Sequence, residues 1–162
     1  IVGFGRIGRR VADLVPSFGA IAVTNDVAAV PTTGNACLCS LEELLSRADI
    51  VTLHMPYSEA SKHLIGEAQL AKMKRGALIV NTARGGLIDE VALESALANG
   101  HLAGAALDTF EIEPYKGPLI GRPEAILTAH MGSYAKESRI QMEREAAENA
   151  LRGLVECGAV SH

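Results

Sequence analysis

Residues 3–8, Gly-Phe-Gly-Arg-Ile-Gly, form a glycine-rich turn of the kind that can bind a pyrophosphate. A short apolar strand precedes the turn and a helix rich in apolar residues follows it. The bare backbone could therefore approach a phosphate that lies on the N-terminus of the helix. The pattern is a weak signal alone, because glycine-rich turns also occur without a ligand.

Asp26 strengthens the pattern, because it stands at the end of the next expected strand, 18 residues after Gly8. A carboxylate there accepts hydrogen bonds from the ribose hydroxyls of adenosine and repels a 2′-phosphate. No Lys or Arg lies between Arg10 and Arg47 to neutralise such a phosphate. The two motifs together predict NAD as the cofactor in preference to NADP. The alternative is an ordinary turn after the strand, for which Asn25-Asp26 is also suited.

Three later segments each begin at the end of an expected strand, and they contain Arg84, Glu113 and His130. The carboxyl ends of the strands in an open parallel sheet line the ligand crevice, so these three residues can converge there from separate loops. Each also has a plain structural interpretation. Arg84 could be a surface cation, Glu113 an extended loop residue before Pro114, and His130 a hydrogen-bonded core histidine.

Apolar segments rich in β-branched residues alternate with helical patterns along the chain, which is typical of βαβ units. This alternation predicts an α/β fold with a doubly wound parallel sheet covered on both faces. The expected strands are 1–3, 20–24, 36–39, 50–54, 77–81, 102–107 and 125–128.

Start and stop signals predict three of the helices. A capping box begins at Ser40, and Asp89 precedes an amphipathic stretch at 90–98. After Ser133, apolar positions fall on one face of a long helix that ends near Gly158. We expect this last helix to pack against the sheet.

The length and composition fit one compact domain. The chain has 162 residues, of which 48% are hydrophobic and 21% charged, so it can bury a proper core. The formal net charge of -4 and the lack of a basic run in the sequence argue against nucleic acid as a partner. No apolar run approaches the ~20 residues of a membrane span, so we expect no membrane partner.

Cys37, Cys39 and Cys157 are an odd and sparse set, so we expect a cytoplasmic protein without a disulfide framework. Cys37 and Cys39 share one face of a short strand and have no second ligand pair nearby, so we expect no metal site. Only two residues precede the first glycine, whereas a buried parallel strand usually runs about five. We therefore expect the chain to be part of a longer protein.

The motifs together resemble the nucleotide-binding domain of the D-isomer-specific 2-hydroxyacid dehydrogenases, the family that includes D-3-phosphoglycerate dehydrogenase. The matching segments are the glycine turn, Asp26, Leu-His-Met-Pro at 53–56, Asn-Thr-Ala-Arg-Gly-Gly-Leu-Ile-Asp at 81–89, Asp-Thr-Phe-Glu-Ile-Glu-Pro at 108–114 and Thr-Ala-His-Met-Gly-Ser at 128–133. The resemblance covers nearly the whole chain. It implies that 1–162 is a single Rossmann-type NAD-binding domain, inserted in a substrate-binding domain whose two flanking segments are absent here.

The resemblance implies an oxidoreductase that transfers hydride between NAD(H) and a D-2-hydroxyacid/2-oxoacid pair. Arg84 would bind the substrate carboxylate and polarise the carbonyl, and His130 would exchange a proton with the substrate oxygen. Glu113 would orient His130 and favour its imidazolium form, and its choice over Glu111 rests on the register of the motif. Asp108 would bind the nicotinamide carboxamide. The implied cofactor contacts are Gly3, Gly5, Arg6, Ile7, Gly8, Asp26, Pro56, Thr82, Ala83, Arg84, Asp108, His130, Gly132 and Ser133.

Some alternatives stay open at this point. Corepressors that resemble this family use NAD(H) as a conformational signal, and adenosylhomocysteine hydrolases share the glycine turn but not the later charged series. The family implies a homodimer in the full-length protein and a small 2-hydroxyacid or 2-oxoacid substrate, with phosphoglycerate, glyoxylate, lactate-like acids and phosphite all possible. The loop 115–123 either approaches the site or is solvated. The remaining histidines, His54, His63, His101 and His162, are expected to be structural or surface residues, with contact to the cofactor as the alternative for His54 at the end of its strand.

Overall fold

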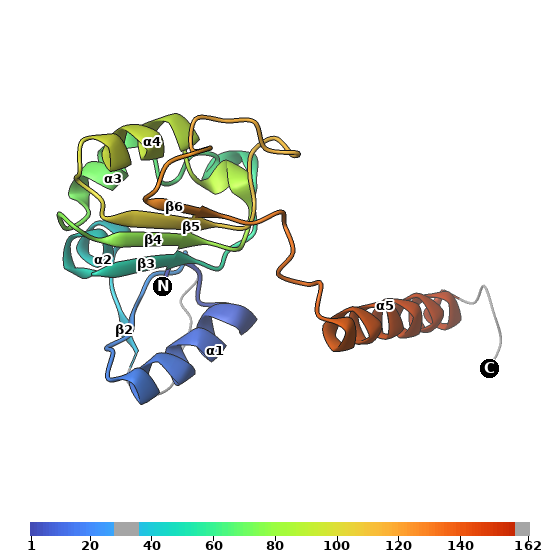
Figure 1. Cartoon of the computed structure of the whole chain (residues 1–162). Coiled ribbons are helices and arrows are strands. Elements are labelled where there is room, and N and C mark those ends of the chain that lie inside the picture. The colour runs from blue at the N-terminus through green and yellow to red at the C-terminus, as the bar shows by residue number, and fades with distance from the viewer. Residues whose placement is uncertain (28–35, 158–162) are drawn as a thin grey trace. The chain divides into compact units, whose positions relative to one another are not determined.

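The computed structural model describes residues 1–27 and 36–157. They belong to two compact units, Ile1–Ala129 and His130–His162, and each unit is described by itself. In the first unit, helices alternate with strands (Figure 1). Its elements are the helices α1 (Arg6–Leu14), α2 (Leu41–Arg47), α3 (Glu67–Lys72) and α4 (Glu90–Ala98), the 3-10 helices η1 (Val15–Phe18), η2 (Glu59–Ser61) and η3 (Gly85–Leu87), and the strands β1 (Val23–Thr24), β2 (Cys37–Leu38), β3 (Ile50–Leu53), β4 (Leu78–Asn81), β5 (Gly104–Leu107) and β6 (Ala125–Leu127).

Strands β3, β4, β5 and β6 form a parallel sheet in that order (Figure 1). Strand β1 pairs in parallel with β2. Val2 joins the two groups, because it forms parallel bridges to Asn25 and to Leu53 of β3. Backbone hydrogen bonds from Val2 N to Thr52 O (2.9 Å) and from Gly3 N to Asn25 O (2.8 Å) support the bridges. The predicted α/β fold with a parallel, Rossmann-type sheet is confirmed.

Two of the expected strands are shorter than the sequence suggests. The expected start of a strand at residue 20 is wrong, because η1 and a left-handed turn at Gly19 (φ 75°) occupy the chain before it, and β1 begins only at Val23. The expected strand at 1–3 contributes only the bridges of Val2. The other strands start and end within two residues of their expected bounds.

One face of the central strands builds the main core. Val51 of β3, Ile79 of β4 and Leu107 of β5 are buried, and α2 and α4 add the buried Leu44 and Leu93. Buried and more exposed side chains alternate along β3 and β4. This period of two fixes the register of the strands. A second, smaller core contains Ile1, Phe4, Ala12 and Ala22. The strands are thus held firmly, and their carboxyl ends can present loops in defined positions.

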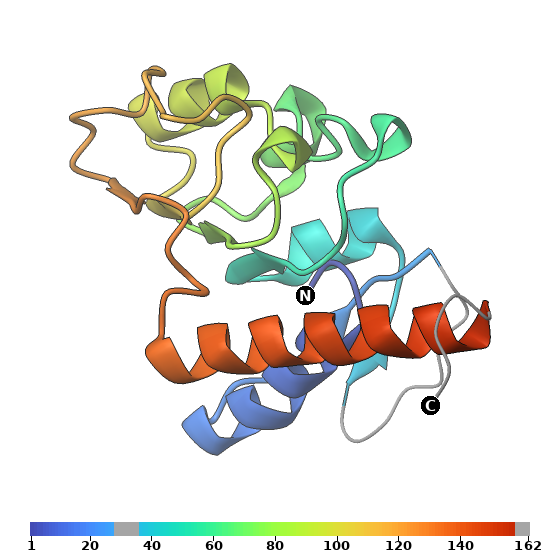
Figure 2. The same ribbon diagram turned by 90° about the vertical axis from the view of Figure 1, so that its right-hand side faces the viewer.

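The second unit is described over residues 130–157 and consists of a loop followed by one long helix, α5 (Lys136–Glu156), seen along its length in Figure 2. Ion pairs four residues apart, Arg139–Glu143 and Arg144–Glu148, favour the local formation of this helix. The helix predicted after Ser133 is confirmed, whereas its predicted end near Gly158 lies outside the described residues. Its packing against the sheet stays a prediction.

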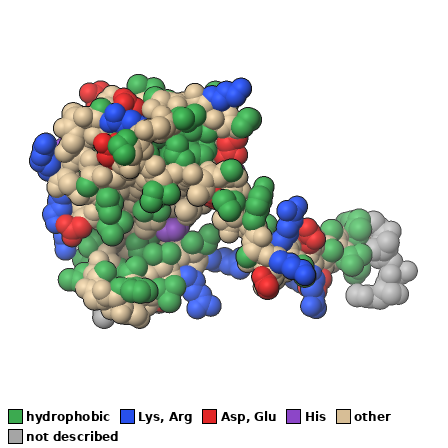
Figure 3. All heavy atoms as spheres, viewed as in Figure 1, with side chains coloured by type: hydrophobic (Ala, Val, Ile, Leu, Met, Phe, Trp, Pro, Cys, Tyr) green, Lys and Arg blue, Asp and Glu red, His purple; other side chains and the backbone are tan. Residues whose placement is uncertain are grey.

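Basic and acidic side chains are scattered over the face seen in Figure 3, with apolar and uncharged groups between them. Within residues 1–27 and 36–157, no helix has both the length and the apolar character needed to cross a bilayer. These same ranges contain no group of three or more His, Cys, Asp or Glu side chains placed to hold a metal ion. The three cysteines are free thiols.

Candidate functional site

The glycine turn packs closely on other backbone. Gly3 has φ 93°, a left-handed conformation that favours glycine, and a Cβ atom there would lie 2.6 Å from the carbonyl oxygen of His54. A Cβ atom at Gly8 would overlap the carbonyl oxygen of Gly3. Glycine at these two positions therefore allows β3, the turn and α1 to approach one another.

Gly5 has a different environment, because a Cβ atom there would meet nothing within 4 Å among the described residues. Gly5 is the N-cap of α1, where no side-chain hydrogen bond caps the helix and no acidic residue lies in the first turn. The backbone N–H groups and the positive end of the helix dipole thus border open space beside the exposed Arg6. This arrangement fits the pyrophosphate of a dinucleotide.

Asp26 is fixed next to this turn. Its Oδ2 accepts a hydrogen bond from Phe4 N at 2.6 Å. The preceding Asn25 exchanges backbone hydrogen bonds with the chain on either side of Val2, at 2.9 Å to Ile1 O and 2.8 Å from Gly3 N. The structure therefore brings the turn and the carboxylate together, as binding of a phosphate and an adjacent ribose requires.

The residues after β3 also lie beside the glycine turn. His54 N donates a hydrogen bond to Val2 O (2.7 Å), and His54 Nε2 lies 3.0 Å from Thr52 Oγ1. Burial lowers the pKa of the His54 imidazole below its ordinary value. Pro56, two residues further along, is exposed. His54 is thus a partly buried side chain beside the glycine turn.

The buried side chain of Asn81 shapes the segment after β4. Its Oδ1 accepts a hydrogen bond from Ala83 N at 3.0 Å, and its Nδ2 donates one to Arg84 O at 2.9 Å. Asn81 is 1% exposed, whereas Thr82 and Arg84 are exposed. The sequence-based assignment gave Asn81 no role. Its position as the last residue of a buried strand, directly before the Arg84 loop, is the signal that could have revealed one.

Gly85 brings the Arg84 loop against the loop that follows β5. A Cβ atom at Gly85 would overlap the main chain of Phe110 and Glu111. The loops that carry Arg84 and Glu113 are therefore in direct main-chain contact.

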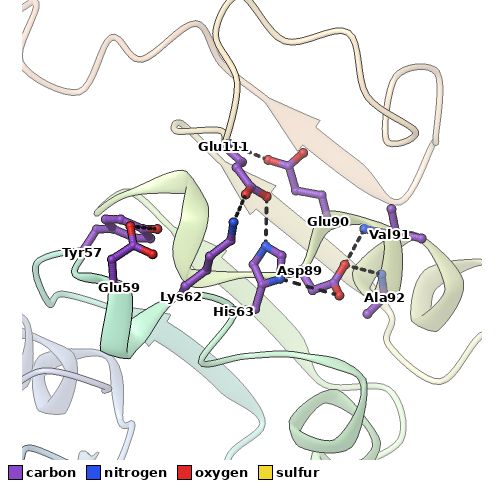
Figure 4. A network of polar contacts seen from close by, with 9 residues as sticks. All are labelled: Tyr57, Glu59, Lys62, His63, Asp89, Glu90, Val91, Ala92 and Glu111. Carbon is purple, nitrogen blue, oxygen red and sulfur yellow. Dashed lines mark hydrogen bonds and ion pairs between the residues drawn. The ribbon is translucent and has the colours of Figure 1, made fainter.

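The two acidic residues of the loop after β5 have different surroundings. Glu113 Oε1 accepts a hydrogen bond from Phe110 N at 3.1 Å, so this side chain folds back on its own loop. Glu111 instead pairs with His63 and Lys62 (Figure 4). Hydrogen bonds from His63 and Lys62 hold the pKa of the Glu111 carboxyl below its ordinary value. Glu111 is thus engaged in a surface network with Lys62 and His63.

Asp108 lies just beyond β5, beside the end of β4. Its backbone N donates to Asn81 O at 2.9 Å, and its Oδ1 accepts a hydrogen bond from Thr128 Oγ1 at 2.6 Å. The residue is 7% exposed. Asp108 is therefore a fixed acceptor at the carboxyl edge of the sheet.

His130, Gly132 and Ser133 lie in the second unit, and His130 is its first residue. His130 adopts a left-handed backbone conformation, with φ 50°. Within the first unit the structure brings the Arg84 and Glu113 loops together, whereas the convergence of His130 with them stays a prediction.

The parallel sheet, the open helix N-terminus at the glycine turn and the neighbouring carboxylate define a Rossmann-type dinucleotide-binding domain. Residues 1–132 match the family model described as D-isomer specific 2-hydroxyacid dehydrogenase, NAD binding domain. The chain belongs to this family, and its cofactor is NAD. The family and the cofactor predicted from the sequence are confirmed.

Three similar proteins illustrate the relationship. The chain is 39% identical over 156 residues to D-3-phosphoglycerate dehydrogenase of Bacillus subtilis (strain 168), across 94% of this chain and 30% of that enzyme. The crystal structure of a glyoxylate reductase from Paecilomyes thermophila matches with a TM-score of 0.91 and 40% identity, across 97% of this chain and 48% of that one. The NAD-complexed D-isomer specific 2-hydroxyacid dehydrogenase from Lactobacillus delbrueckii ssp. bulgaricus matches with a TM-score of 0.86 and 32% identity, across 97% of this chain and 52% of that one.

The chain therefore spans about half the length of these proteins or less. All three are named as dehydrogenases or reductases, and none of them as a corepressor.

Proposed function

We propose that this chain is the cofactor-binding domain of an NAD-dependent dehydrogenase that interconverts a D-2-hydroxyacid and the corresponding 2-oxoacid. The main-chain contact at Gly85 carries the proposal, because it joins the Arg84 loop after β4 to the Glu113 loop after β5. Ligands of open parallel sheets bind at this carboxyl edge. In this proposal, residues other than these 162 complete the substrate pocket.

In this proposal the cofactor lies along the same edge. Gly3, Gly5, Arg6, Ile7 and Gly8 surround the pyrophosphate at the start of α1, and Asp26 accepts hydrogen bonds from the adenosine ribose. The remaining contacts are assigned to Pro56, Thr82, Ala83, Arg84, Asp108, His130, Gly132 and Ser133. When bound, NADH supplies the hydride that reduces C2 of the oxoacid.

The side chains of this chain supply the rest of the chemistry. Arg84 binds the substrate carboxylate with its planar guanidinium. His130 donates a proton to the carbonyl oxygen during reduction and accepts one from the hydroxyl during oxidation. Glu113 orients the imidazole. Glu111 is less suited to this role, because its carboxylate pairs with two other side chains.

We further propose that the complete protein is a cytoplasmic homodimer with a small 2-hydroxyacid or 2-oxoacid as its substrate. Free thiols at all three cysteines support a reducing compartment. The net charge of -4 supports a small-molecule substrate over nucleic acid. The dimer rests on the family resemblance.

Titration of NADH into the 162-residue chain, followed by fluorescence or calorimetry, tests the cofactor site. We expect saturable binding of NADH and about tenfold weaker binding of NADPH, because Asp26 repels the 2′-phosphate. A folded chain that binds neither nucleotide would contradict the proposal.

A panel of 2-oxoacids offered with NADH to the complete enzyme tests the reaction. We expect His130→Ala to lower kcat by about 10²- to 10⁴-fold with little change in NADH affinity, because a proton donor acts on the chemical step. Unchanged turnover would remove His130 from this role.

A further inference from the structure

A polar network links the turn at residues 62–63, the start of α4 and Glu111 of the loop after β5 (Figure 4). At its centre is His63, which the sequence suggested to be a structural or surface residue. His63 Nε2 lies 2.9 Å from Glu111 Oε2, and His63 Nδ1 lies 3.9 Å from Asp89 Oδ2. Figure 4 shows the His63 ring between these two carboxylates, which belong to different segments of the chain.

The backbone of His63 forms a second link. His63 N donates a hydrogen bond to Gly86 O at 2.8 Å, and Gly86 lies two residues after Arg84. His63 adopts φ 49°, a left-handed conformation that is uncommon for a residue with a side chain. His63 therefore contacts the Arg84 loop through its main chain and the Glu113 loop through its ring.

Glu111 is held from its other side as well. Its backbone N donates to Glu90 Oε1 at 2.8 Å, and its Oε1 lies 3.2 Å from Lys62 Nζ. Glu90 is the first residue of α4, and the helix is capped by Asp89. The network thus ties the loop after β5 to the start of α4 and to the turn at residues 62–63.

We propose that His63 is a positioning residue that, by joining Gly86 to Glu111, holds the loop carrying Glu113 against the loop carrying Arg84. This inference rests on the proposed function, because the spacing of the two loops matters for turnover only if both serve one reaction. There is no room for a side chain at Gly85, because its main chain packs directly against that of Phe110 and Glu111. A misplacement of about 1 Å can lower a rate about 10²-fold.

Amide hydrogen exchange in the 162-residue chain tests the positioning directly. The backbone amides of Phe110 and Glu111 report on it, because they donate hydrogen bonds to Glu113 Oε1 and Glu90 Oε1, respectively. We expect His63→Ala to speed their exchange about tenfold relative to the wild type. His63→Gln should restore part of the protection, since its amide can also donate to a carboxylate. Unchanged exchange in His63→Ala would overturn the proposal.

Lys74→Ala provides a matched control, because Lys74 forms an exposed ion pair with Asp49 that involves neither loop. We expect exchange at the two amides in this variant to equal that of the wild type. Equal acceleration in Lys74→Ala and His63→Ala would overturn a specific role for His63.

Steady-state kinetics of the complete enzyme gives the second readout. We expect His63→Ala to lower kcat about tenfold to a hundredfold while KM for NADH stays within about twofold, and His63→Gln to recover part of kcat. An unchanged kcat, or an equal loss in kcat and in NADH affinity, would overturn the positioning role. A wild-type enzyme that reduces no oxoacid would instead contradict the proposed function, and hydrogen exchange would still decide the role of His63.

Discussion

The side chain of Asn81 donates a hydrogen bond from Nδ2 to the carbonyl oxygen of Arg84, 2.9 Å away. The same carboxamide accepts a hydrogen bond from Ala83 N. One buried side chain at the end of β4 therefore fixes the backbone from which Arg84 projects.

Asn81→Ala should lower the free energy of unfolding by about 1–3 kcal/mol, because it removes the acceptor of Ala83 N and leaves Arg84 O with only the longer hydrogen bond from Leu87 N. Urea unfolding of the 162-residue chain measures this change. Asn99→Ala is the control, since Asn99 also accepts a backbone hydrogen bond, from His101 N, but is exposed at the end of α4. A loss in Asn99→Ala as large as that in Asn81→Ala would show that burial of Asn81 is not the cause.

Two glycines of the same turn should respond differently to alanine. Gly8→Ala should destabilise the chain by more than about 2 kcal/mol, because the new Cβ overlaps the Gly3 carbonyl oxygen. Gly5→Ala should fold normally, since its Cβ enters open space at φ -74°, but it should weaken NADH binding about tenfold by intruding on the proposed pyrophosphate site. Thermal unfolding and NADH titration separate the two effects. Wild-type affinity in Gly5→Ala would mean that the cofactor does not approach this position.

Asp26→Asn should alter cofactor preference without unfolding the turn. The amide oxygen can still accept the hydrogen bond from Phe4 N, while the negative charge is lost. We expect the ratio of the NADPH to the NADH dissociation constant to fall about tenfold. Asp49→Asn removes a surface carboxylate paired with Lys74 and should leave the ratio unchanged. A ratio that is the same in Asp26→Asn and in the wild type would remove Asp26 from the ribose site.

The lowered pKa of His54 should make stability depend on pH. In the unfolded chain the imidazole binds a proton near its ordinary pKa of about 6.5, whereas burial keeps it neutral in the folded chain to lower pH. The unfolded state therefore binds more protons, and the folded state loses stability as the pH falls below about 6.5. His54→Gln should flatten this part of the curve, measured by urea unfolding between pH 7.5 and 5. Parallel curves for the variant and the wild type would exclude His54 as the cause.

Local sequence patterns predicted the elements well where one residue type dominates the local energetics. Helix α4 occupies the expected residues 90–98, because Asp89 accepts hydrogen bonds from the free N–H groups of Val91 and Ala92. The buried strands β3 and β4 follow their apolar runs. The start of the strand near residue 20 was predicted too early. Apolar residues such as Ile21 suggested a strand there, but Ile21 is exposed, and η1 and the turn at Gly19 occupy the preceding residues.

The site was predictable only as far as its motifs lie at strand ends. The glycine turn and Asp26 meet because adjacent parallel strands must deliver both to one edge. The contact of His63 with Glu111 was not predictable, since the two residues are 48 positions apart and meet only through the packing of several segments. The choice of Glu113 over Glu111 was made from the register of the motif, and it stays a prediction.

The fit at Gly85 has a consequence for how sequences of this fold can diverge. A side chain at this position is incompatible with the present path of residues 110 and 111. Any natural or designed variant that places alanine or a larger residue there must also reroute the loop after β5. In related sequences, glycine at the position of residue 85 therefore indicates the loop path seen here, and any other residue indicates a different path.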